Sequence, residues 1–248
     1  LTTRRQRQMC IRDRVEGNSV ILRNGDTITA KVIVDAGGHN GVIRRDYWTE
    51  ESTKIPVKFV LMDGDFGEAV ELHFGSMAPG GYAWMFPKSS GANIGLGIQR
   101  SFSKGKNLNQ YTDEFVAKYD GEITFNGAGS LPMSGTIKKF VKGNYVLVGD
   151  AAGMVLPSNG AGITIAMIGG RIAGNVIAEH LKSGVPLEEY EKIWKKQMGK
   201  VMANSKRSFK IGSLLFRLPD WILNMMFNRL TKGIIWRAVT CRKMFWVV

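Results

Sequence analysis

The 248-residue sequence contains 44% hydrophobic residues and 30 glycines, which is typical of a globular α/β protein and excludes a disordered chain. Its formal net charge of +13 resides at its two ends, because residues 1–14 and 200–248 are basic while the charges of residues 15–199 balance. The body of the chain is therefore neutral, and this distribution argues against a nucleic-acid partner.

Cysteine, histidine and hydropathy patterns exclude further classes of protein. Cys10 and Cys241 are the only cysteines, which is unlike a disulfide scaffold and suits a reducing compartment. The three histidines are scattered, so we expect no metal site. No apolar run reaches the length of a transmembrane helix, and the basic N-terminal stretch leads into no signal-peptide core. We therefore expect a cytoplasmic location.

The first predicted elements follow a basic segment without periodicity. We interpret residues 1–14 as a non-native leader, with an exposed basic arm as the alternative. Residues 15–22 and 27–34 alternate around an Asn-Gly-Asp turn and predict a β-hairpin. The second strand runs into Ala36-Gly-Gly38, where a ligand could approach the backbone closely at a strand end. A simple glycine-rich loop is equally compatible with this segment.

Residues 56–142 change character and predict an antiparallel sheet. The expected strands are 57–62, 69–74, 82–86 and 93–98, followed by a helix over 103–120 and further strands within 122–141. Because strand side chains alternate, Tyr82, Trp84 and Phe86 share one face and form an aromatic wall. The alternative is that these three aromatic residues belong to the core of the sheet.

The segment from Tyr145 to Gly174 is the most informative part of the sequence. It predicts a buried strand at 145–148, then Gly149 and the carboxylate of Asp150, and then a helix opened by Gly160 and Gly162. The N-terminus of such a helix presents amide groups and a positive dipole end, which suits an electron-rich ligand. Further glycines at 169, 170 and 174 permit close helix packing. The alternative is an ordinary strand-turn-helix in which Asp150 is a turn residue.

The C-terminal part is predicted to be helical from 187 to about 209 and basic to the end. Residues 211–248 mix Leu, Ile, Met and Trp with Lys and Arg, as helices lying in a membrane interface do. Helices packed on the rest of the protein with a solvated basic face are an equal alternative. So many large apolar residues oppose a nucleic-acid function for this tail.

Two motifs resemble those of a known family. Residues 145–174 resemble the second flavin-contacting motif of FAD-dependent oxidoreductases related to aromatic hydroxylases and geranylgeranyl reductases. Residues 79–88, with Asn93-Ile-Gly-Leu-Gly97, resemble the aromatic hallmark of the geranylgeranyl reductases. After the strand that ends at Ala36, Gly37 and Gly41 stand where the flavin domain of this family usually has an aspartate and a serine. The chain contains no Gly-x-Gly-x-x-Gly turn, so we interpret it as the C-terminal portion of a longer enzyme.

The resemblance implies an α/β (α+β) fold with three parts. These are a partial FAD-binding Rossmann-like domain (15–55 and 143–186), an antiparallel-sheet substrate domain (56–142) and a helical basic C-terminal region (187–248). It assigns Asp150 to the ribityl chain of FAD and the amides of Gly162 and Ile163 to the flavin. The remaining implied cofactor contacts come from the backbone of Ala36, Gly38, Gly149 and Gly160.

The resemblance further implies that the protein reduces C=C bonds of geranylgeranyl chains in membrane ether lipids. The substrate contacts it implies are Tyr82, Trp84 and Phe86 for the isoprenoid chain, and Lys206 or Arg242 for a phosphate. The reductant would be NAD(P)H or a ferredoxin-type donor, and the protein would associate peripherally with a membrane. No residue is an evident proton donor, so no catalytic residue is assigned. The rival functions are a flavin monooxygenase or halogenase and a non-catalytic membrane-surface protein.

Overall fold

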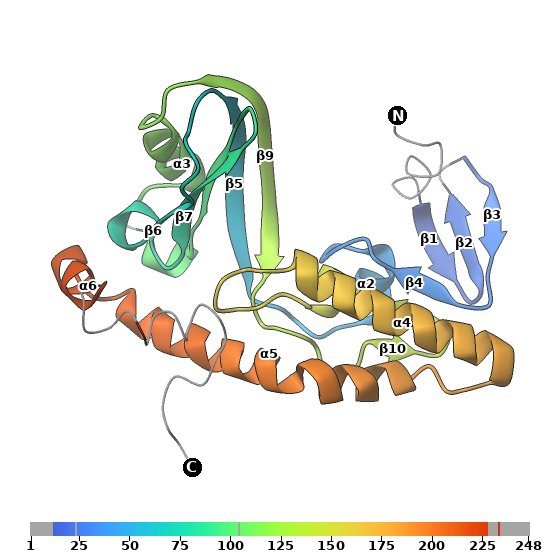
Figure 1. The fold of residues 1–248 in the computed structure, drawn as a ribbon. Coiled ribbons are helices and arrows are strands. Elements are labelled where there is room, and N and C mark those ends of the chain that lie inside the picture. Colours follow the sequence, from blue (N-terminus) through green and yellow to red (C-terminus); the bar gives the residue numbers. More distant parts are fainter. Residues whose placement is uncertain (1–11, 23, 104, 228–232, 234–248) are drawn as a thin grey trace, which may run out of the picture. The chain divides into compact units, whose positions relative to one another are not determined.

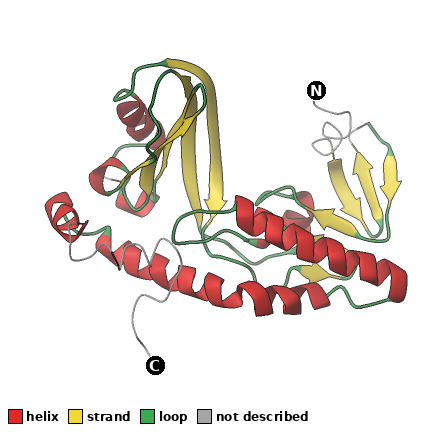
Figure 2. Ribbon diagram, viewed as in Figure 1, coloured by secondary structure: helices red, strands yellow, loops and turns green. Residues whose placement is uncertain are grey.

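The computed structural model describes residues 12–22, 24–103, 105–227 and 233, and it has the predicted mixed α/β fold (Figures 1 and 2). The chain divides into two compact units. Unit 1 comprises residues 1–53 and 132–203, and unit 2 comprises residues 54–131 and 204–248. Residues 54–131 of unit 2 are therefore inserted into unit 1 in the order of the sequence, while residues 204–248 follow it.

Unit 1 contains two small sheets and several helices. Its first sheet comprises β1 (Arg12–Glu16), β2 (Ser19–Leu22) and β3 (Thr27–Thr29), and its second comprises β4 (Ile33–Asp35), β10 (Val141–Lys142) and β11 (Tyr145–Leu147). Its helices are α2 (Val42–Tyr47), the 3₁₀ turn η3 (Gly149–Ala152) and α4 (Ile163–Ser183). The helix α5 (Glu189–Leu215) begins in unit 1 and ends in unit 2.

The predicted hairpin around the Asn-Gly-Asp turn is present, because β2 pairs with β3, but its strands are shorter than expected. A turn at Gly17, which has a φ of +55°, divides the expected first strand into β1 and β2. These pair as neighbours with Val15 opposite Val20, and β2 in turn pairs with β3. The expected second strand also divides, because β3 ends at Thr29 and β4 belongs to the other sheet. Pairing in β1 begins at Arg12, within the segment interpreted as a leader.

The second sheet of unit 1 depends on a long-range parallel pair. β11 lies parallel to β4, with Tyr145 opposite Ile33 and Leu147 opposite Asp35. All three residues of β11 are buried, as the apolar pattern predicted. The carboxyl ends of these two strands consequently lie side by side, which is where parallel sheets bind ligands.

Asp35 fixes the turn between β4 and α2. Its fully buried carboxylate accepts hydrogen bonds from the amides of Gly37 (2.8 Å) and Arg44 (3.0 Å). The Arg44 amide lies in the first turn of α2, where a negative charge is favourable. A Cβ atom on Gly41 would lie 2.3 Å from both carboxylate oxygens, so only glycine fits there. The buried Arg44 side chain donates to the carbonyl oxygens of Trp48 (3.0 Å) and Glu50.

Helix α4 packs closely at one of the three glycines expected to allow it. A Cβ on Gly169 would lie 2.5 Å from the sulfur of Met154 and 3.3 Å from the hydroxyl of Tyr190 on α5. Gly170 and Gly174 meet no atom within 4 Å, so they do not serve close packing among the described residues. The close approach at Gly169 therefore helps to position α4 against the loop that follows β11.

Unit 2 is a five-stranded sheet covered on one face by α3. The strand order is β6-β7-β8-β5-β9, and the pairs β6–β7, β7–β8 and β8–β5 are antiparallel. Strands β5 to β8 correspond to the four predicted over 56–100, and β9 lies within the further strands predicted over 122–141. Their bounds are β5 (Lys54–Asp63), β6 (Glu71–His73), β7 (Tyr82–Lys88), β8 (Gly91–Gly97) and β9 (Glu122–Pro132). The unit also holds η1 (Gly75–Met77), η2 (Arg100–Phe102), α3 (Leu108–Val116) and α6 (Asp220–Phe227).

Helix α3 is shorter than the predicted 103–120 and forms the core of unit 2 with one face of the sheet. It begins at Leu108 because the Asn107 side chain accepts from the Gln110 amide (3.0 Å) while Gln110 accepts from the Asn107 amide (2.8 Å). Its Phe115 is fully buried against the sheet. The sheet residues of this core are Val60, Met62, Ala83, Met85, Ala92, Ile94 and Leu96.

We predict that Gly41→Ala lowers the free energy of unfolding by about 1–3 kcal/mol, the usual cost of forcing an atom into a packed site. The added Cβ would meet the buried Asp35 carboxylate, which cannot move without breaking its bonds to the two amides. Urea denaturation measures the change. Gly170→Ala, in the exposed interior of α4, is the control and should be neutral or up to about 1 kcal/mol stabilising. Equal effects of the two changes would contradict the assigned role of Gly41.

Candidate functional site

The candidate cofactor site of unit 1 lies where β11 ends. The chain turns at Gly149, whose φ is +60°, and Asp150 follows in the 3₁₀ turn η3. The turn closes at Gly153, also with a positive φ, where any Cβ would lie 2.6 Å from the carbonyl oxygen of Gly135. These two glycines let the backbone reverse tightly, and they leave the Asp150 side chain half-buried.

The Asp150 carboxylate lies beside the start of α4. A Cβ on Gly162, the residue before this helix, would lie 3.4 Å from Asp150 Oδ1 and 3.3 Å from a methyl group of Val155. Burial raises the pKa of Asp150. Within the residues that the structure describes, no side chain or amide donates a hydrogen bond to this carboxylate. A desolvated carboxylate without a protein partner is costly in itself, and it suits a ligand that carries hydroxyl groups.

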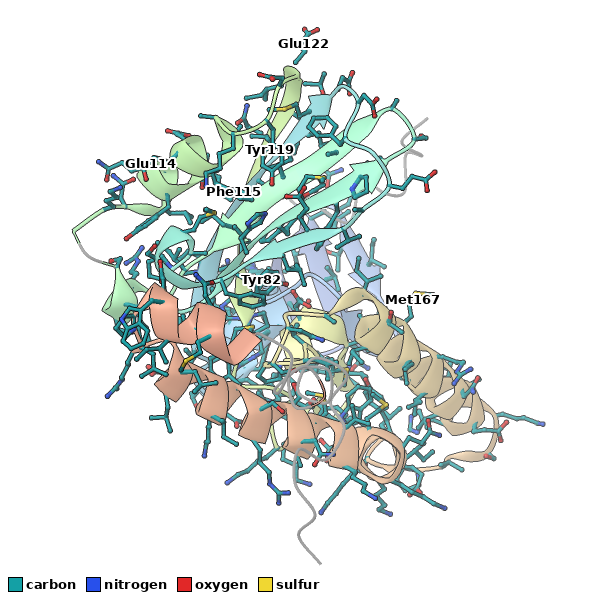
Figure 3. All side chains as sticks on the ribbon, turned by 60° about the vertical axis from the view of Figure 1, so that its left-hand side comes forward. Tyr82, Glu114, Phe115, Tyr119, Glu122 and Met167 are labelled. Atoms are coloured by element: carbon teal, nitrogen blue, oxygen red, sulfur yellow. The ribbon has the colours of Figure 1, made fainter. Side chains whose placement is uncertain are left out.

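The loop before α4 holds the helix N-terminus open. The amides of Asn159 and Gly160 both donate to Leu156 O (3.3 and 2.8 Å), and Gly160 adopts a φ of +72°. The first backbone bond of the helix runs from Ala166 N to Gly162 O (2.7 Å), so the amides before it have no partner inside the helix. Ile163 is 82% exposed, and Met167, labelled in Figure 3, is 69% exposed. The predicted groups Asp150, Gly160, Gly162 and Ile163 are thus brought together in one segment of unit 1.

The turn after β4 offers backbone groups, rather than side chains, to a ligand. Ala36 is exposed, and Gly38 has a φ of +76° and accepts a hydrogen bond from the Gly41 amide (3.0 Å). Because β4 and β11 are parallel neighbours, this turn follows the same edge of the sheet as Gly149. The sequence analysis overlooked Asp35, although aspartate side chains commonly accept hydrogen bonds from backbone amides of a turn that follows a strand.

The predicted aromatic face of β7 is present in unit 2. The ring centres of Tyr82 and Trp84 are 5.8 Å apart, and those of Trp84 and Phe86 are 5.9 Å apart and stacked. The alternating residues Ala83 and Met85 are buried in the core beneath α3. The three aromatic side chains therefore lie on the sheet face opposite the core, where Phe86 is 37% exposed. Burial raises the pKa of Tyr82.

A polar cluster lies on the face of the same sheet that α3 covers. Glu71 accepts a hydrogen bond from the Tyr119 hydroxyl (2.8 Å) and pairs with the His73 ring (2.9 Å). The bond to His73 lowers the pKa of Glu71 most, and the bond from Tyr119 lowers it further. His73 makes an edge contact with Phe115 of α3, 5.2 Å between ring centres. Phe115 and Tyr119 are labelled in Figure 3. This cluster belongs to the α3 side of the sheet and not to the aromatic face.

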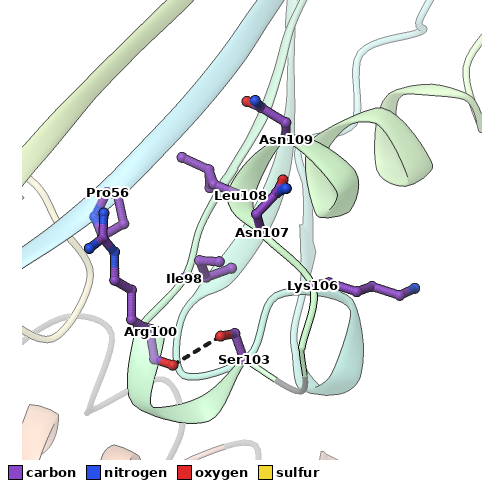
Figure 4. A pocket seen from close by; sticks show the side chains of 8 residues that line it. All are labelled: Pro56, Ile98, Arg100, Ser103, Lys106, Asn107, Leu108 and Asn109. Carbon is purple, nitrogen blue, oxygen red and sulfur yellow. Dashed lines mark hydrogen bonds between the residues drawn. The ribbon is translucent and has the colours of Figure 1, made fainter.

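A cavity of about 400 Å³ lies at the beginning of α3 (Figure 4). Lys106, one of its lining cations, is engaged by the Glu114 carboxylate at 2.6 Å, and Ser103 donates to the carbonyl oxygen of Arg100. Arg100, the other cation in the lining, has no acidic partner among the residues that the structure describes. The cavity is lined by Pro56, Ile98, Arg100, Ser103, Lys106, Asn107, Leu108 and Asn109.

The C-terminal region is only partly described. Lys206 is exposed on α5, and Arg242, the other residue predicted to bind a phosphate, lies outside the described residues. Helix α6 is anchored within unit 2 because Asp220 accepts from the amide (3.0 Å) and hydroxyl of Ser76. Its Trp221 and Met225 are 67% and 61% exposed. In the described part of the chain, no helix combines the length and apolar character needed to cross a membrane.

The sequence matches known proteins along most of its length. Residues 53–128 match the family described as geranylgeranyl reductase catalytic domain. The digeranylgeranylglycerophospholipid reductase of Methanocella arvoryzae is 35% identical over 240 residues, which cover 90% of this chain and 60% of that protein. The digeranylgeranylglycerophospholipid reductase 2 of Methanothermobacter thermautotrophicus is 39% identical over 170 residues, covering 66% of this chain and 43% of that protein.

The fold also matches a solved structure. A geranylgeranyl bacteriochlorophyll reductase-like protein from Thermoplasma acidophilum superposes with a TM-score of 0.75 at 22% identity, covering 90% of this chain and 61% of that one. The chain spans 60% of the length of the Methanocella relative. The matched domain contains the strands that carry the aromatic face, and the relatives extend the match into the Asp150 segment. These findings together show that the chain is similar to geranylgeranyl reductases over most of its own length.

Proposed function

We propose that this chain is part of an FAD-dependent reductase that saturates C=C bonds in the geranylgeranyl chains of membrane lipids. The observation that carries the proposal is the aromatic face of β7, which points away from the core of unit 2. A second observation, the Asp150 carboxylate beside α4 that finds no partner among the described residues, supports a flavin site in unit 1. Both lie in a chain whose relatives are named as reductases of a digeranylgeranyl lipid.

The residues of unit 1 fit a flavin. Asp150 would accept hydrogen bonds from ribityl hydroxyls, and the amides of Gly162 and Ile163 would face the electron-rich edge of the ring at the positive end of α4. The absence of a side chain at Gly162 keeps open the space between Asp150 and Val155. The turns at Gly149, Gly160 and Ala36–Gly38 would add backbone contacts. When bound, FAD would supply the hydride chemistry, while the protein supplies position and electrostatics.

The aromatic face suits an isoprenoid chain. A polyprenyl chain has no polar groups to recognise, so its binding must come from apolar and aromatic contact area. Tyr82, Trp84 and Phe86 supply such a surface on one strand. Leu72, opposite Trp84 on β6, and Phe125 on β9 extend it and are 43% and 52% exposed. Lys206 and Arg242 remain the proposed contacts for a phosphate head group.

A membrane surface is the proposed source of the lipid. The described end of α5 and the following turn carry Lys206, Arg207, Lys210 and Arg217, and the exposed Leu214, Trp221 and Met225 lie in the same stretch of chain. Cations beside exposed tryptophan and aliphatic residues favour the interface of an anionic leaflet. This arrangement supports peripheral attachment of a cytoplasmic enzyme.

The rival functions predict different observations. A flavin monooxygenase or halogenase would consume oxygen when its aromatic or polyketide substrate is added. A membrane-surface protein without catalytic function would bind no flavin in its full-length form. The Asp150 site disfavours this second rival. A half-buried carboxylate with no partner in the described part of the chain has no evident use in a protein that only binds membranes.

We predict that Asp150→Ala in the full-length protein weakens FAD binding by about 1.5–3 kcal/mol, roughly tenfold to hundredfold, because a charge-assisted hydrogen bond is lost. Isothermal titration measures the affinity. The apoprotein should be as stable as before or more stable, because burial of the charged carboxylate is unfavourable in the folded state. Unchanged FAD affinity would remove Asp150 from the site, and a large loss of stability would assign it a structural role.

We predict that Trp84→Ala in the full-length enzyme reduces turnover of a C20 isoprenoid lipid at least tenfold, with FAD affinity within about twofold of the original. The physical reason is the loss of apolar contact to the substrate, about 1.5–3 kcal/mol for one large side chain. Steady-state rates and flavin titration provide the two measurements.

The neighbouring residue provides a matched control for Trp84. Met85 lies on the opposite face of the same strand and is 2% exposed, so Met85→Ala should lower the free energy of unfolding by about 2–5 kcal/mol. If Trp84→Ala destabilises the fold as much as Met85→Ala does, the aromatic face is structural and the proposed lipid contact is wrong.

We predict that changing Lys206, Arg207, Lys210 and Arg217 to Gln releases the protein from vesicles of phosphatidylglycerol and phosphatidylcholine, because each basic residue near an anionic surface contributes about 1 kcal/mol. Co-sedimentation at low and high salt measures binding, and salt should release much of the unaltered protein. The control changes Lys192, Lys195, Lys196 and Lys200, an equal charge on the earlier part of α5. Equal loss of binding in both variants would show that only net charge matters.

A further inference from the structure

Glycines line the aromatic face of unit 2 in register with its large side chains. Gly95 of β8 lies opposite Trp84 of β7 on one side and opposite Phe59 of β5 on the other. In the next row, Gly97 lies between Tyr82 and Val57. Because directly opposite residues share a face of the sheet, each row places a residue without a side chain between two large ones.

The rings lie over these glycines. A Cβ on Gly95 would lie 2.7 Å from Cζ2 of Trp84 and 2.5 Å from Cβ of Phe59, so the indole occupies the space above the Gly95 backbone. A Cβ on Gly127 of β9 would lie 2.4 Å from Cζ of Phe59, so the phenyl ring covers Gly127 in the same way. The glycines thus let both rings settle onto the sheet, and any side chain there would lift them.

The orientation of the indole is fixed by a single hydrogen bond. Trp84 Nε1 donates to Asn93 Oδ1 at 2.7 Å, between adjacent strands on the aromatic face. Asn93 lies opposite Phe86 and is half-buried among apolar neighbours. A buried indole N–H without an acceptor is unfavourable, so the bond selects one position of the ring.

We propose that Asn93 is a positioning residue that holds Trp84 down on Gly95, and that Gly127 does the same for Phe59 by leaving room beneath it. The two rings then form the floor of the site for the isoprenoid chain, and their height sets the space available to it. This inference rests on the proposed function of the aromatic face. Its consequence is that Asn93 affects lipid binding only through the indole N–H of Trp84.

A double-mutant cycle in the full-length enzyme tests this consequence. Asn93→Leu removes the acceptor at similar volume, and Trp84→Phe removes the donor while keeping an aromatic ring. With a geranylgeranyl glycerophospholipid in detergent micelles, Asn93→Leu should raise KM about fivefold in the Trp84 enzyme and less than twofold in the Trp84→Phe enzyme. The rate of flavin reduction without lipid should not change. Equal increases of KM in both backgrounds would overturn the positioning role of Asn93.

Two glycines of β9 provide a second test that does not involve Asn93. Gly127→Ala should raise Phe59 and increase KM for the C20 lipid about fivefold, with a smaller effect on a C10 prenyl lipid. Gly129→Ala is the matched control, because its Cβ would meet only Val57 at an ordinary 3.8 Å, and KM should stay within twofold. Thermal unfolding of each variant separates a misfolded protein from an altered site.

The outcomes distinguish a failure of the proposed function from a failure of the proposed role of the glycines. If the unaltered full-length enzyme does not turn over any prenyl lipid, the proposed function is wrong. If it turns over the lipid but Gly127→Ala and Gly129→Ala have equal KM values, the floor formed by Phe59 is wrong while the function stands.

Discussion

The parallel pairing of β4 with β11 is the constraint on which the rest of the structure depends. These strands are separated by more than a hundred residues, and their register, Ile33 opposite Tyr145, brings two distant segments to one sheet edge. The Gly149–Asp150 turn follows one strand and the Ala36–Gly38 turn follows the other. Asp35 holds its side of this edge through two amide hydrogen bonds, which orient α2. A shift in this register would separate the proposed cofactor contacts.

Unit 2 depends on a different rule, the alternation of side chains across a sheet. Along β7, Ala83 and Met85 enter the core beneath α3, while Tyr82, Trp84 and Phe86 form the opposite face. Stability and recognition are thus assigned to alternate residues of one strand. The same division applies to β5, where Val60 and Met62 belong to the core and Phe59 lies opposite Gly95 on the aromatic face. Substitutions on the aromatic face are therefore largely decoupled from the core.

Much of this organisation could be predicted from local patterns. The strand before Asp150, the helix after Gly162 and the common face of Tyr82, Trp84 and Phe86 follow from periodicity and from glycine positions. Boundaries that depend on single residues were missed: Gly17 divides a strand, and the Asn107 cap delays α3 by several residues. Contacts between residues that are distant in the chain could not be predicted from the sequence either. No pattern indicates that Gly41 faces Asp35, or that Trp84 Nε1 finds its acceptor at Asn93.

The chain leaves unit 1 and returns to it at neighbouring points. The amide of Met133 donates to Thr53 O at 2.8 Å, and the amide of Thr53 donates to the Ser134 hydroxyl at 2.7 Å. The two ends of the inserted segment 54–131 are therefore clamped together inside the host unit. A segment whose ends already meet can be exchanged for another at little entropic cost to its host. The junction at Thr53 and Met133 is therefore a suitable place to replace segment 54–131 with a different recognition domain while keeping the proposed cofactor-binding unit.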